Sequence, residues 1–504
     1  MPKKSSEQIS IDFDVCLLSD YKAMQFLETS EFMVDWSCLY EHCCHASVFQ
    51  HPSFVLPWYR KNKEDHIPVL LAVYEGKKLC ALLTLARKVD EKTGKASNKL
   101  IGAGAFYALY QTWLILPGYE AIFWEKGLKK LFREMPGCSI NLKSLPTREL
   151  YAGMTKVSSF KRLAVLEKHL NPVLDFGEDG YQQVFGKRHF RAKYNRLGRA
   201  GKMDFEKISS AEELTTAMET IEVYHNLRQG AAFNKVPFHQ DKKEKQLFRD
   251  WFEEGVLHVT ALKLDQELIA SVIVVNDFGK TGHLAGLITY SPRHAKLSPG
   301  LVHLYLLGQK LLDESFMHMK LSPGDDAYKE RFCNRHEELF EILISPNWRE
   351  RFYRRIRVLF RAYMSKKGIR PMAVQVNVSK KLAELKNFLY TIFANNKDFS
   401  SATVVKKLEL IKNGGNNGDL MINSDLLSDL LRANDRNFSI CRWKFLEDAL
   451  KRLEDQENFI TVIKEEELVL CVWYSRGLEN SENYKNSFEE KDITKIYASN
   501  QIKI

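Results

Sequence analysis

The sequence of 504 residues has no apolar run long enough to cross a membrane. Its most apolar stretch, Ile101 to Leu116, is interrupted by two glycines, a glutamine and three Tyr or Trp residues. It is also shorter than the roughly 20 residues that a spanning helix needs. The basic N-terminus, MPKKSSEQIS, is not followed by the apolar segment of a signal peptide. We therefore expect a cytoplasmic protein.

Signatures of metal knuckles and disulfide scaffolds are also missing. None of the nine cysteines has CxxC spacing, and Cys43 and Cys44 are adjacent. This pattern is typical of free, mostly buried thiols in a reducing compartment. The sequence also has no zinc-finger spacing and no Gly–aromatic pattern of an RNA-recognition module. We expect no bound metal, and nucleic acid is not a favoured partner.

The overall composition is that of a globular protein. Hydrophobic residues make up 45% and charged residues 27% of the chain, which excludes a disordered or collagen-like chain. At roughly 150 residues per domain, the length suggests about three domains. The 74 basic residues exceed the 64 acidic ones by ten. This mild excess suits anionic ligands, anionic membranes or nucleic acid, and selects none of them.

Three segments share a pattern of strand, short polar turn and strand: residues 67–88, 255–275 and 458–475. Two of them are followed by the same layout. After the first come a strand ending at Leu116, Pro117-Gly118, a helix over 121–134 and a strand from Cys138. After the second come a strand ending at Tyr290, a basic loop, Ser298-Pro299-Gly300, a helix to about Asp313 and a strand ending at Leu321. This layout predicts a duplicated α/β domain with mixed, largely antiparallel sheets.

The order of elements predicts four regions. Residues 1–175 and 176–345 form the two copies, 346–399 a basic amphipathic helix and connector, and 400–504 a smaller α+β segment with a polar tail. We expect the last region to be a partial third copy that packs on the acceptor cleft of the second, and its tail after Ser475 to be partly disordered. An unrelated α+β appendage is the alternative.

Residues 187–331 resemble the CelD-like (BioF-like) acyltransferases of the GNAT superfamily of N-acyltransferases. The resemblance rests on a basic helix with Arg188, Arg191, Arg196 and Arg199, the apolar hairpin, Tyr290, Ser298-Pro299-Gly300, Gly324-Asp325 and Tyr328-Lys329. The Fem-type transferases are similar in having two tandem GNAT-like domains. The resemblance implies tandem GNAT-like domains of mixed α/β fold, an acyl-CoA co-substrate with acetyl as the acyl group, and transfer to an amine.

The loop before the second-copy helix is suited to a pyrophosphate. Arg293 and Lys296 supply positive charge, Ser298 and Pro299 suit the start of a helix, and Gly300 lets an anion approach the backbone. By the resemblance, Tyr290, Arg293, Lys296, Ser298, Gly300 and Leu301 bind coenzyme A. The alternative is a helix cap without a ligand. The first copy has Pro117-Gly118-Tyr119-Glu120 here, with no basic residue, and we interpret it as degenerate.

An acyl transfer to an amine needs a base for the amine and an acid for the thiolate leaving group. Asp325 is the candidate base, Tyr328 a candidate proton donor and Lys329 a charge partner or substrate clamp. A surface turn without a catalytic role is the alternative. His283 and His258 are weaker candidates.

Two basic stretches, Lys187–Lys207 and Arg349–Lys367, each carry eight Lys or Arg. An anionic acceptor, an anionic membrane touched peripherally, nucleic acid, or a solvated face paired with nearby carboxylates would each explain them. In the second stretch, Phe352, Ile356, Leu359, Phe360 and Tyr363 form an apolar stripe, which we expect to dock on the enzyme domain.

The sequence therefore predicts an enzyme, an N-acyltransferase that uses acyl-CoA. Its acceptor would be a small-molecule or glycan amine, such as an amino sugar, in exopolysaccharide or cell-envelope synthesis, as the resemblance implies. A Fem-type transferase that uses aminoacyl-tRNA and a catalytically inactive GNAT-like scaffold are the alternatives.

Overall fold

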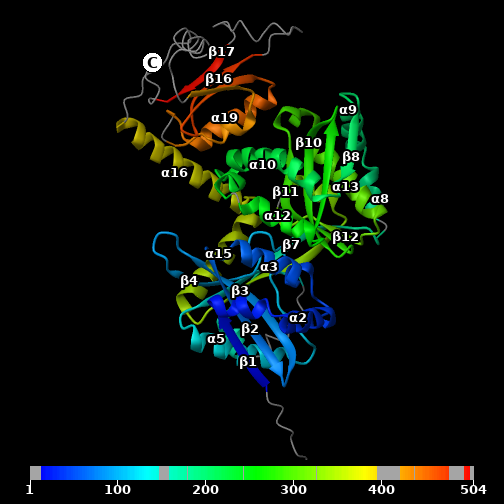
Figure 1. The fold of residues 1–504 in the computed structure, drawn as a ribbon, viewed down its shortest axis with the longest axis vertical. Helices are drawn as coiled ribbons and strands as arrows, with labels where there is room; N and C mark the ends of the chain where they lie inside the picture. Colours follow the sequence, from blue (N-terminus) through cyan, green and yellow to red (C-terminus); the bar gives the residue numbers. More distant parts are fainter. Residues whose placement is uncertain are drawn as a thin grey trace, which may run out of the picture.

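The computed structural model describes residues 13–146, 158–178, 180–241, 243–324, 326–393, 420–435, 438–475 and 493–499. Figure 1 shows two α/β halves, one blue to cyan and one green, with a small unit at the C-terminal end. The predicted fold class, mixed α/β with a smaller C-terminal α+β segment, is confirmed. The exact domain boundaries stay predictions.

The first half follows the order of strand, helices, hairpin, strand, helix and two strands. Its elements are β1 (Phe13–Ser19), α1 (Asp20–Leu27), α2 (Ser30–His42), η1 (Val48–Gln50), α3 (Pro52–Lys61), β2 (His66–Glu75), β3 (Lys78–Val89), β4 (Ala96–Gly102), β5 (Leu114–Ile115), α4 (Glu120–Ile122), η2 (Phe123–Gly127), α5 (Leu128–Glu134), β6 (Ser139–Leu145), α7 (Ser158–Leu163) and β7 (Ala164–Asp175). The helix predicted over 121–134 is irregular, because a π-helical turn, η2, separates α4 from α5.

The second half repeats this order. Its elements are α8 (Gly180–Gly186), α9 (Arg188–Gly198), β8 (Met203–Lys207), α10 (Ala211–Phe233), α11 (Pro237–Gln240), α12 (Lys243–Glu253), β9 (Leu257–Leu264), β10 (Glu267–Asp277), β11 (Thr281–Tyr290), η3 (Pro292–Leu297), α13 (Pro299–Asp313), β12 (His318–Lys320), α14 (Ala327–Phe332) and β13 (Arg335–Ile344). The β9–β10 turn is tight because Asp265 and Gln266 both have positive φ, as a type I′ hairpin turn requires.

The two halves share one sheet, in which the last strands are exchanged. The described strands follow the order β1-β2-β3-β4-β6-β13-β7-β12-β11-β10-β9-β8, with β5 beside β3. β13, the last strand of the second half, pairs with β6 of the first half, whereas β7 pairs with β12 of the second. β7 and β13 also pair with each other, from Ala164 opposite Ile344 to Val173 opposite Arg335. The halves are therefore joined through their own strands.

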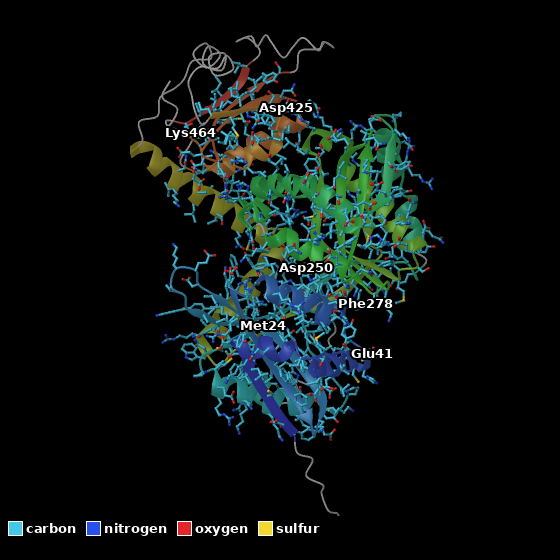
Figure 2. The ribbon with its side chains drawn as sticks, viewed as in Figure 1. Met24, Glu41, Asp250, Phe278, Asp425 and Lys464 are labelled. Carbon is cyan, nitrogen blue, oxygen red and sulfur yellow. The ribbon has the colours of Figure 1, made fainter. Side chains whose placement is uncertain are left out.

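The helices cover the sheet and share a core across the halves. Trp251 of α12 stacks on Phe54 of α3, with ring centroids 4.7 Å apart, and its indole N–H donates to the Phe54 carbonyl at 2.9 Å. Phe278, in the β10–β11 turn, lies where the halves meet (Figure 2) and packs edge to face on Tyr40 and His51. No helix in the described part of the chain is both long enough and apolar enough to span a bilayer.

The C-terminal part follows two helices, α15 (Trp348–Lys366) and α16 (Pro371–Phe393). It consists of β14 (Leu420–Ser424), α18 (Leu427–Leu430), α19 (Arg442–Glu454), β15 (Asn458–Lys464), β16 (Glu467–Tyr474) and β17 (Ile493–Ala498). The four strands form a separate antiparallel sheet, here called the C-terminal unit together with α18 and α19. β17 lies in the polar tail after Ser475, and the expectation that this tail is partly disordered stays a prediction.

The C-terminal unit packs on α10 of the second half. Leu227, Ala231 and Val236 share an apolar cluster with Phe445 and Leu446 of α19. The Trp443 indole donates to the Ala231 carbonyl at 2.9 Å. Removing the unit would expose this face of α10, so point substitutions are better probes of its role than truncation.

Candidate functional site

The two central strands of the second half separate after a short paired stretch. β11 and β12 are parallel and pair only at 281–283 with 318–320. β11 continues to Tyr290 beside β10, so no described strand pairs with its other edge over residues 284–290. Here we call this stretch the open edge of β11. An unpaired strand edge presents backbone N–H and C=O groups that can bind an extended ligand.

Two side chains already contact the open edge. The Ser322 hydroxyl donates to the Leu284 carbonyl, and the Arg228 guanidinium donates to the Ile288 carbonyl. Arg228 also lies over the Tyr290 ring, 4.3 Å from its centroid. Sequence reasoning missed Arg228, because it lies on α10, far from β11 in the chain, and no motif marks it.

Helix α13 begins where the open edge ends. Ser298 precedes it with φ of 60°, and its hydroxyl does not cap the helix but accepts a hydrogen bond from Lys193 Nζ of α9 at 2.8 Å. The first amides of a helix and its dipole favour an anion. An ammonium has three donors, so Lys193 keeps two for a ligand. Lys193 lies in the basic stretch but was not singled out from the sequence.

Gly300 is required for packing at this helix start. A Cβ placed on Gly300 would lie 2.9 Å from Cδ1 of the Tyr290 ring. Leu301, the next residue, is half-buried and packs on the apolar cluster beneath α13. Substituting Gly300 would therefore displace Tyr290, and such a variant would not test anion binding alone.

The two predicted cations of the loop face the C-terminal unit. Arg293 donates to the Glu457 carbonyl at 3.1 Å and pairs with the Asp425 carboxylate at 2.7 Å. Lys296 pairs with Asp455 at 3.1 Å. Figure 2 labels Asp425 in the C-terminal unit. We expected that unit to pack on the acceptor cleft; among the described residues it contacts η3, α10 and α16.

The predicted catalytic turn lies after β12. Asp325 lies outside the described residues. Burial, and then the nearby charge of Asp326, raise the pKa of the Tyr328 phenol to about 12, while Arg228 lowers it slightly. Lys329 is buried, and its ammonium donates to the carbonyls of Ser322 and Pro323 at 3.2 and 3.3 Å. It also pairs with Asp326 at 3.3 Å. Lys329 thus holds the turn together.

In the first half, the Glu120 side chain occupies the place equivalent to the start of α13. The Glu120 carboxylate accepts a hydrogen bond from the Gly118 amide at 2.9 Å. A carboxylate here accepts from a backbone N–H group that an anionic ligand would need as a donor. Its negative charge would also repel phosphate. This contact supports the interpretation of the first half as a degenerate copy.

A buried polar cluster lies where the two halves meet. Tyr110 donates to Glu337 at 2.7 Å, Lys320 pairs with Glu337 at 3.2 Å, and Asn171 donates to the same carboxylate at 3.3 Å. Burial is the main cause that lowers the pKa of His283, which packs edge to face on Tyr110 with centroids 5.2 Å apart. The Nε2 atom of His283 faces the Asp277 carboxylate at 3.8 Å, beyond hydrogen-bond distance, and Nδ1 has no hydrogen-bond partner among the described residues.

His283 lies near the point where β11 leaves β12, and burial favours the neutral form of its imidazole. The other histidine candidate, His258, has a partner. Its Nε2 lies 2.9 Å from the Glu314 carboxylate, which also binds Lys207 at 3.1 Å. Burial lowers the pKa of His258. This arrangement is a structural contact between β9 and the end of α13.

The arginines of α9 remain open to solvent. Arg188, Arg191, Arg196 and Arg199 are exposed and pair with no carboxylate within the described ranges. Lys207, at the end of the same stretch, does pair with Glu314. The exposed face of α9 is therefore not neutralised by carboxylates of the described residues. Lys193 is the α9 cation that contacts the start of α13.

Two groups of side chains have the composition of metal ligands. Glu330, Cys333 and His336 have ligand atoms within 4.8 Å of one another at the surface. The second group, which includes Glu167 and Glu341, already binds the Arg354 guanidinium. The expectation of no metal stays a prediction.

The comparisons with known proteins identify the class of the second half. Residues 186–330 match the acetyltransferase (GNAT) domain family. This stretch contains the open edge, the start of α13 and the turn after β12. The chain therefore carries a GNAT acetyltransferase domain, as the sequence predicted, and the CelD-like assignment is finer than this match. No curated protein matches the chain.

Several solved structures are similar to the chain at low identity. FemX is 8% identical, over 61% of this chain and 95% of its own, with a TM-score of 0.41. The structure of L-PGS from Bacillus licheniformis is 12% identical, over 63% of this chain and 92% of its own, with a TM-score of 0.40. A tandem GNAT protein from the clavulanic acid biosynthesis pathway is 11% identical, over 66% and 98%, with a TM-score of 0.37.

Proposed function

We propose that the chain is a CelD-like N-acyltransferase that moves an acyl group, acetyl first among them, from acyl-CoA to an amine. The acceptor proposed is a small-molecule or glycan amine, such as an amino sugar in exopolysaccharide or cell-envelope synthesis. The observation that carries the proposal is the open edge of β11, which leads to the start of α13 within the matched GNAT region. The acceptor rests on the family resemblance alone.

The donor is held by backbone groups and by one lysine. The open edge offers amides and carbonyls to the extended arm of acyl-CoA, and its pyrophosphate lies at the first turn of α13. Lys193, fixed by its bond to Ser298, supplies positive charge there. Arg293 and Lys296 contribute only when their pairs with Asp425 and Asp455 open.

The chemistry needs one proton acceptor and one proton donor. The amine nitrogen attacks the thioester carbonyl, the C–S bond breaks, and the thiolate of coenzyme A takes up a proton. The Tyr328 phenol, which is protonated near neutral pH because its pKa is raised to about 12, is the group proposed to supply that proton. Asp325 and the neutral imidazole of His283 are the two groups proposed to accept the amine proton.

The exposed arginine face of α9 favours a second candidate function. An aminoacyl-tRNA donor would neutralise that face by its phosphates and would make binding strongly dependent on salt. A Fem-type transferase of this kind would bind tRNA and have no need for coenzyme A.

Calorimetry with acetyl-CoA and with tRNA distinguishes the two functions. Lys193→Ala should weaken acetyl-CoA binding roughly tenfold or more, since a hydrogen bond to a charged group contributes about 1.5–3 kcal/mol. Arg191→Ala, on the opposite face of α9, is the matched control and should leave acetyl-CoA binding unchanged. Binding of tRNA without binding of acetyl-CoA, with tRNA affinity lowered by Arg191→Ala, would reject the acyl-CoA proposal.

A further inference from the structure

Helix α15 turns its apolar side to solvent. Phe352, Ile356, Leu359, Phe360 and Tyr363, here called the α15 stripe, are between 47% and 70% exposed. Their spacing of four, three, one and three residues places them on one helical face. We expected this stripe to dock on the enzyme domain, and that expectation is wrong.

The opposite face of α15 is the one that docks, through charge. Arg354 pairs with Glu167 of β7 at 2.8 Å and with Glu341 of β13. Arg361 pairs with the same Glu167 at 2.7 Å. Burial alone would raise the pKa of Glu341, but the hydrogen bond and charge of Arg354 outweigh it and hold the pKa below its usual value. These buried pairs fix the rotation of α15, so the exposed stripe is a consequence of the fold.

Helix α16 repeats this arrangement. Val374, Val378, Leu382 and Leu385, here called the α16 stripe, are 40–61% exposed. The other face of α16 contacts the C-terminal unit by polar groups. Lys380 pairs with Glu447 at 2.5 Å, and Glu384 with Lys444 at 3.5 Å. Two consecutive helices therefore both present apolar faces to solvent.

The borders of the stripes are cationic. Arg349, Arg355, Lys366 and Lys367 flank the α15 stripe, and all four are exposed. The only acidic residue of α15, Glu350, points inward and accepts from the Ser345 hydroxyl at 2.6 Å. An aromatic and aliphatic stripe bordered by Lys and Arg without acids is complementary to lipid whose headgroups are anionic.

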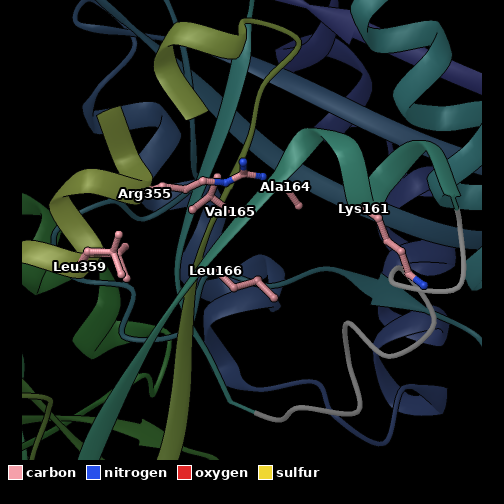
Figure 3. Close-up of a pocket in the computed structure, with 7 residues that line it drawn as sticks. Lys161, Ala164, Val165, Leu166, Arg355 and Leu359 are labelled. Atoms are coloured by element: carbon pink, nitrogen blue, oxygen red, sulfur yellow. The ribbon is translucent and has the colours of Figure 1, made fainter. Parts of the chain in front are cut away.

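An apolar groove opens beside the α15 stripe, between α15 and β7. It has a volume of about 460 Å³, and Leu166, Val358 and Leu359 are among the apolar side chains that line it. Figure 3 shows the Arg355 side chain crossing the groove above Val165, with Lys161 of α7 at its far end. This volume is in the range of small-molecule sites, and two cations stand over apolar walls.

We propose that the α15 and α16 stripes dock on an anionic lipid bilayer. The apolar side chains enter the boundary between headgroups and acyl chains, while the flanking cations contact lipid phosphates. The groove beneath Arg355 takes up part of a lipid acyl chain whose headgroup is held by Arg355 and Lys161. This contact is peripheral, and it does not depend on which donor the transferase uses.

Vesicle co-sedimentation of the full chain tests the proposal. The protein should partition onto phosphatidylcholine vesicles that contain phosphatidylglycerol, and not onto phosphatidylcholine alone. Leu359→Glu should lower the partitioning by about tenfold or more, the loss expected when one Leu side chain no longer leaves water. Tyr21→Glu, an equally exposed position on α1, is the matched control and should bind as the parent chain does.

Three outcomes would overturn the proposal. One is equal or absent partitioning onto the two vesicle types, and another is unchanged partitioning of folded Leu359→Glu. The third is a different occupant of the stripes. Sedimentation equilibrium showing a dimer that Leu359→Glu dissociates would assign the stripes to a second copy. A Leu359→Cys thiol that a water-soluble maleimide does not modify in a lipid-free monomer would assign them to the segment 394–419.

Discussion

The pair between Arg293 and Asp425 sets up a competition between the C-terminal unit and an anionic ligand. We predict that Asp425→Asn tightens acetyl-CoA binding, because it leaves the Arg293 guanidinium without its carboxylate partner. The substitution is conservative in shape. Asp425 Oδ1 also accepts a hydrogen bond from the Phe459 amide at 3.0 Å, and the Asn carbonyl oxygen can accept the same bond.

The size of the effect follows from the exposure of the pair. The Arg293 and Asp425 side chains are 21% and 37% exposed, so solvent screens their attraction. A pair of this kind contributes about 0.2–1 kcal/mol, which limits the gain in acetyl-CoA affinity to roughly fivefold. Lys296 and Asp455 are 61% and 51% exposed, so Asp455→Asn should change the affinity less and serves as the matched control.

Isothermal titration with acetyl-CoA at low salt measures both variants. The gain should shrink as ionic strength rises, since salt screens exposed charges. Adding Arg293→Ala to Asp425→Asn should remove the gain. Unchanged or weaker binding by a folded Asp425→Asn protein would refute the reasoning, because Arg293 would then be a docking residue of the C-terminal unit only.

Two further predictions concern stability. Burial lowers the pKa of His303 from 6.5 to about 3, so below pH 6.5 the unfolded chain binds a proton that the folded chain does not. Because of His303, the free energy of unfolding should fall by about 2 kcal/mol between about pH 7 and pH 5. Urea titrations of His303→Gln at the two pH values should lack this decrease. Arg354→Met should cost about 3–5 kcal/mol, because it leaves Glu167 and Glu341 buried without this partner. Arg355→Met, on the exposed side of α15, should change urea stability by less than about 0.5 kcal/mol.

Local patterns predicted the elements that depend on nearby residues. The three hairpins are observed as β2–β3, β9–β10 and β15–β16, because alternation and turn chemistry are set within a few residues. The helix after Ser298-Pro299-Gly300 begins at Pro299 for the same reason.

Features that depend on distant partners could not be predicted. The apolar stripe of α15 indicated which residues share a face, but not that Glu167 and Glu341 would hold the opposite face inward. Similarly, the charge of Arg293 suggested a phosphate, whereas its partner Asp425 lies in another part of the fold. A sequence pattern shows the chemistry of a side chain, but only the tertiary structure shows which group that side chain contacts.

The exchange of β7 and β13 also constrains how the chain can be synthesised and folded. The first half leaves the ribosome with one edge of β6 paired to β4 and the other edge open, because the strand that completes it is the last one of the second half. Residues 139–145 can therefore pair with β13 only after Ile344 has been synthesised. Until then, their unpaired edge could pair with a wrong strand. Closing so long a loop makes this pairing a late and slow step of folding. Neither half expressed alone would contain all the strands of its sheet. A gene that lacks either half would therefore not encode a complete sheet.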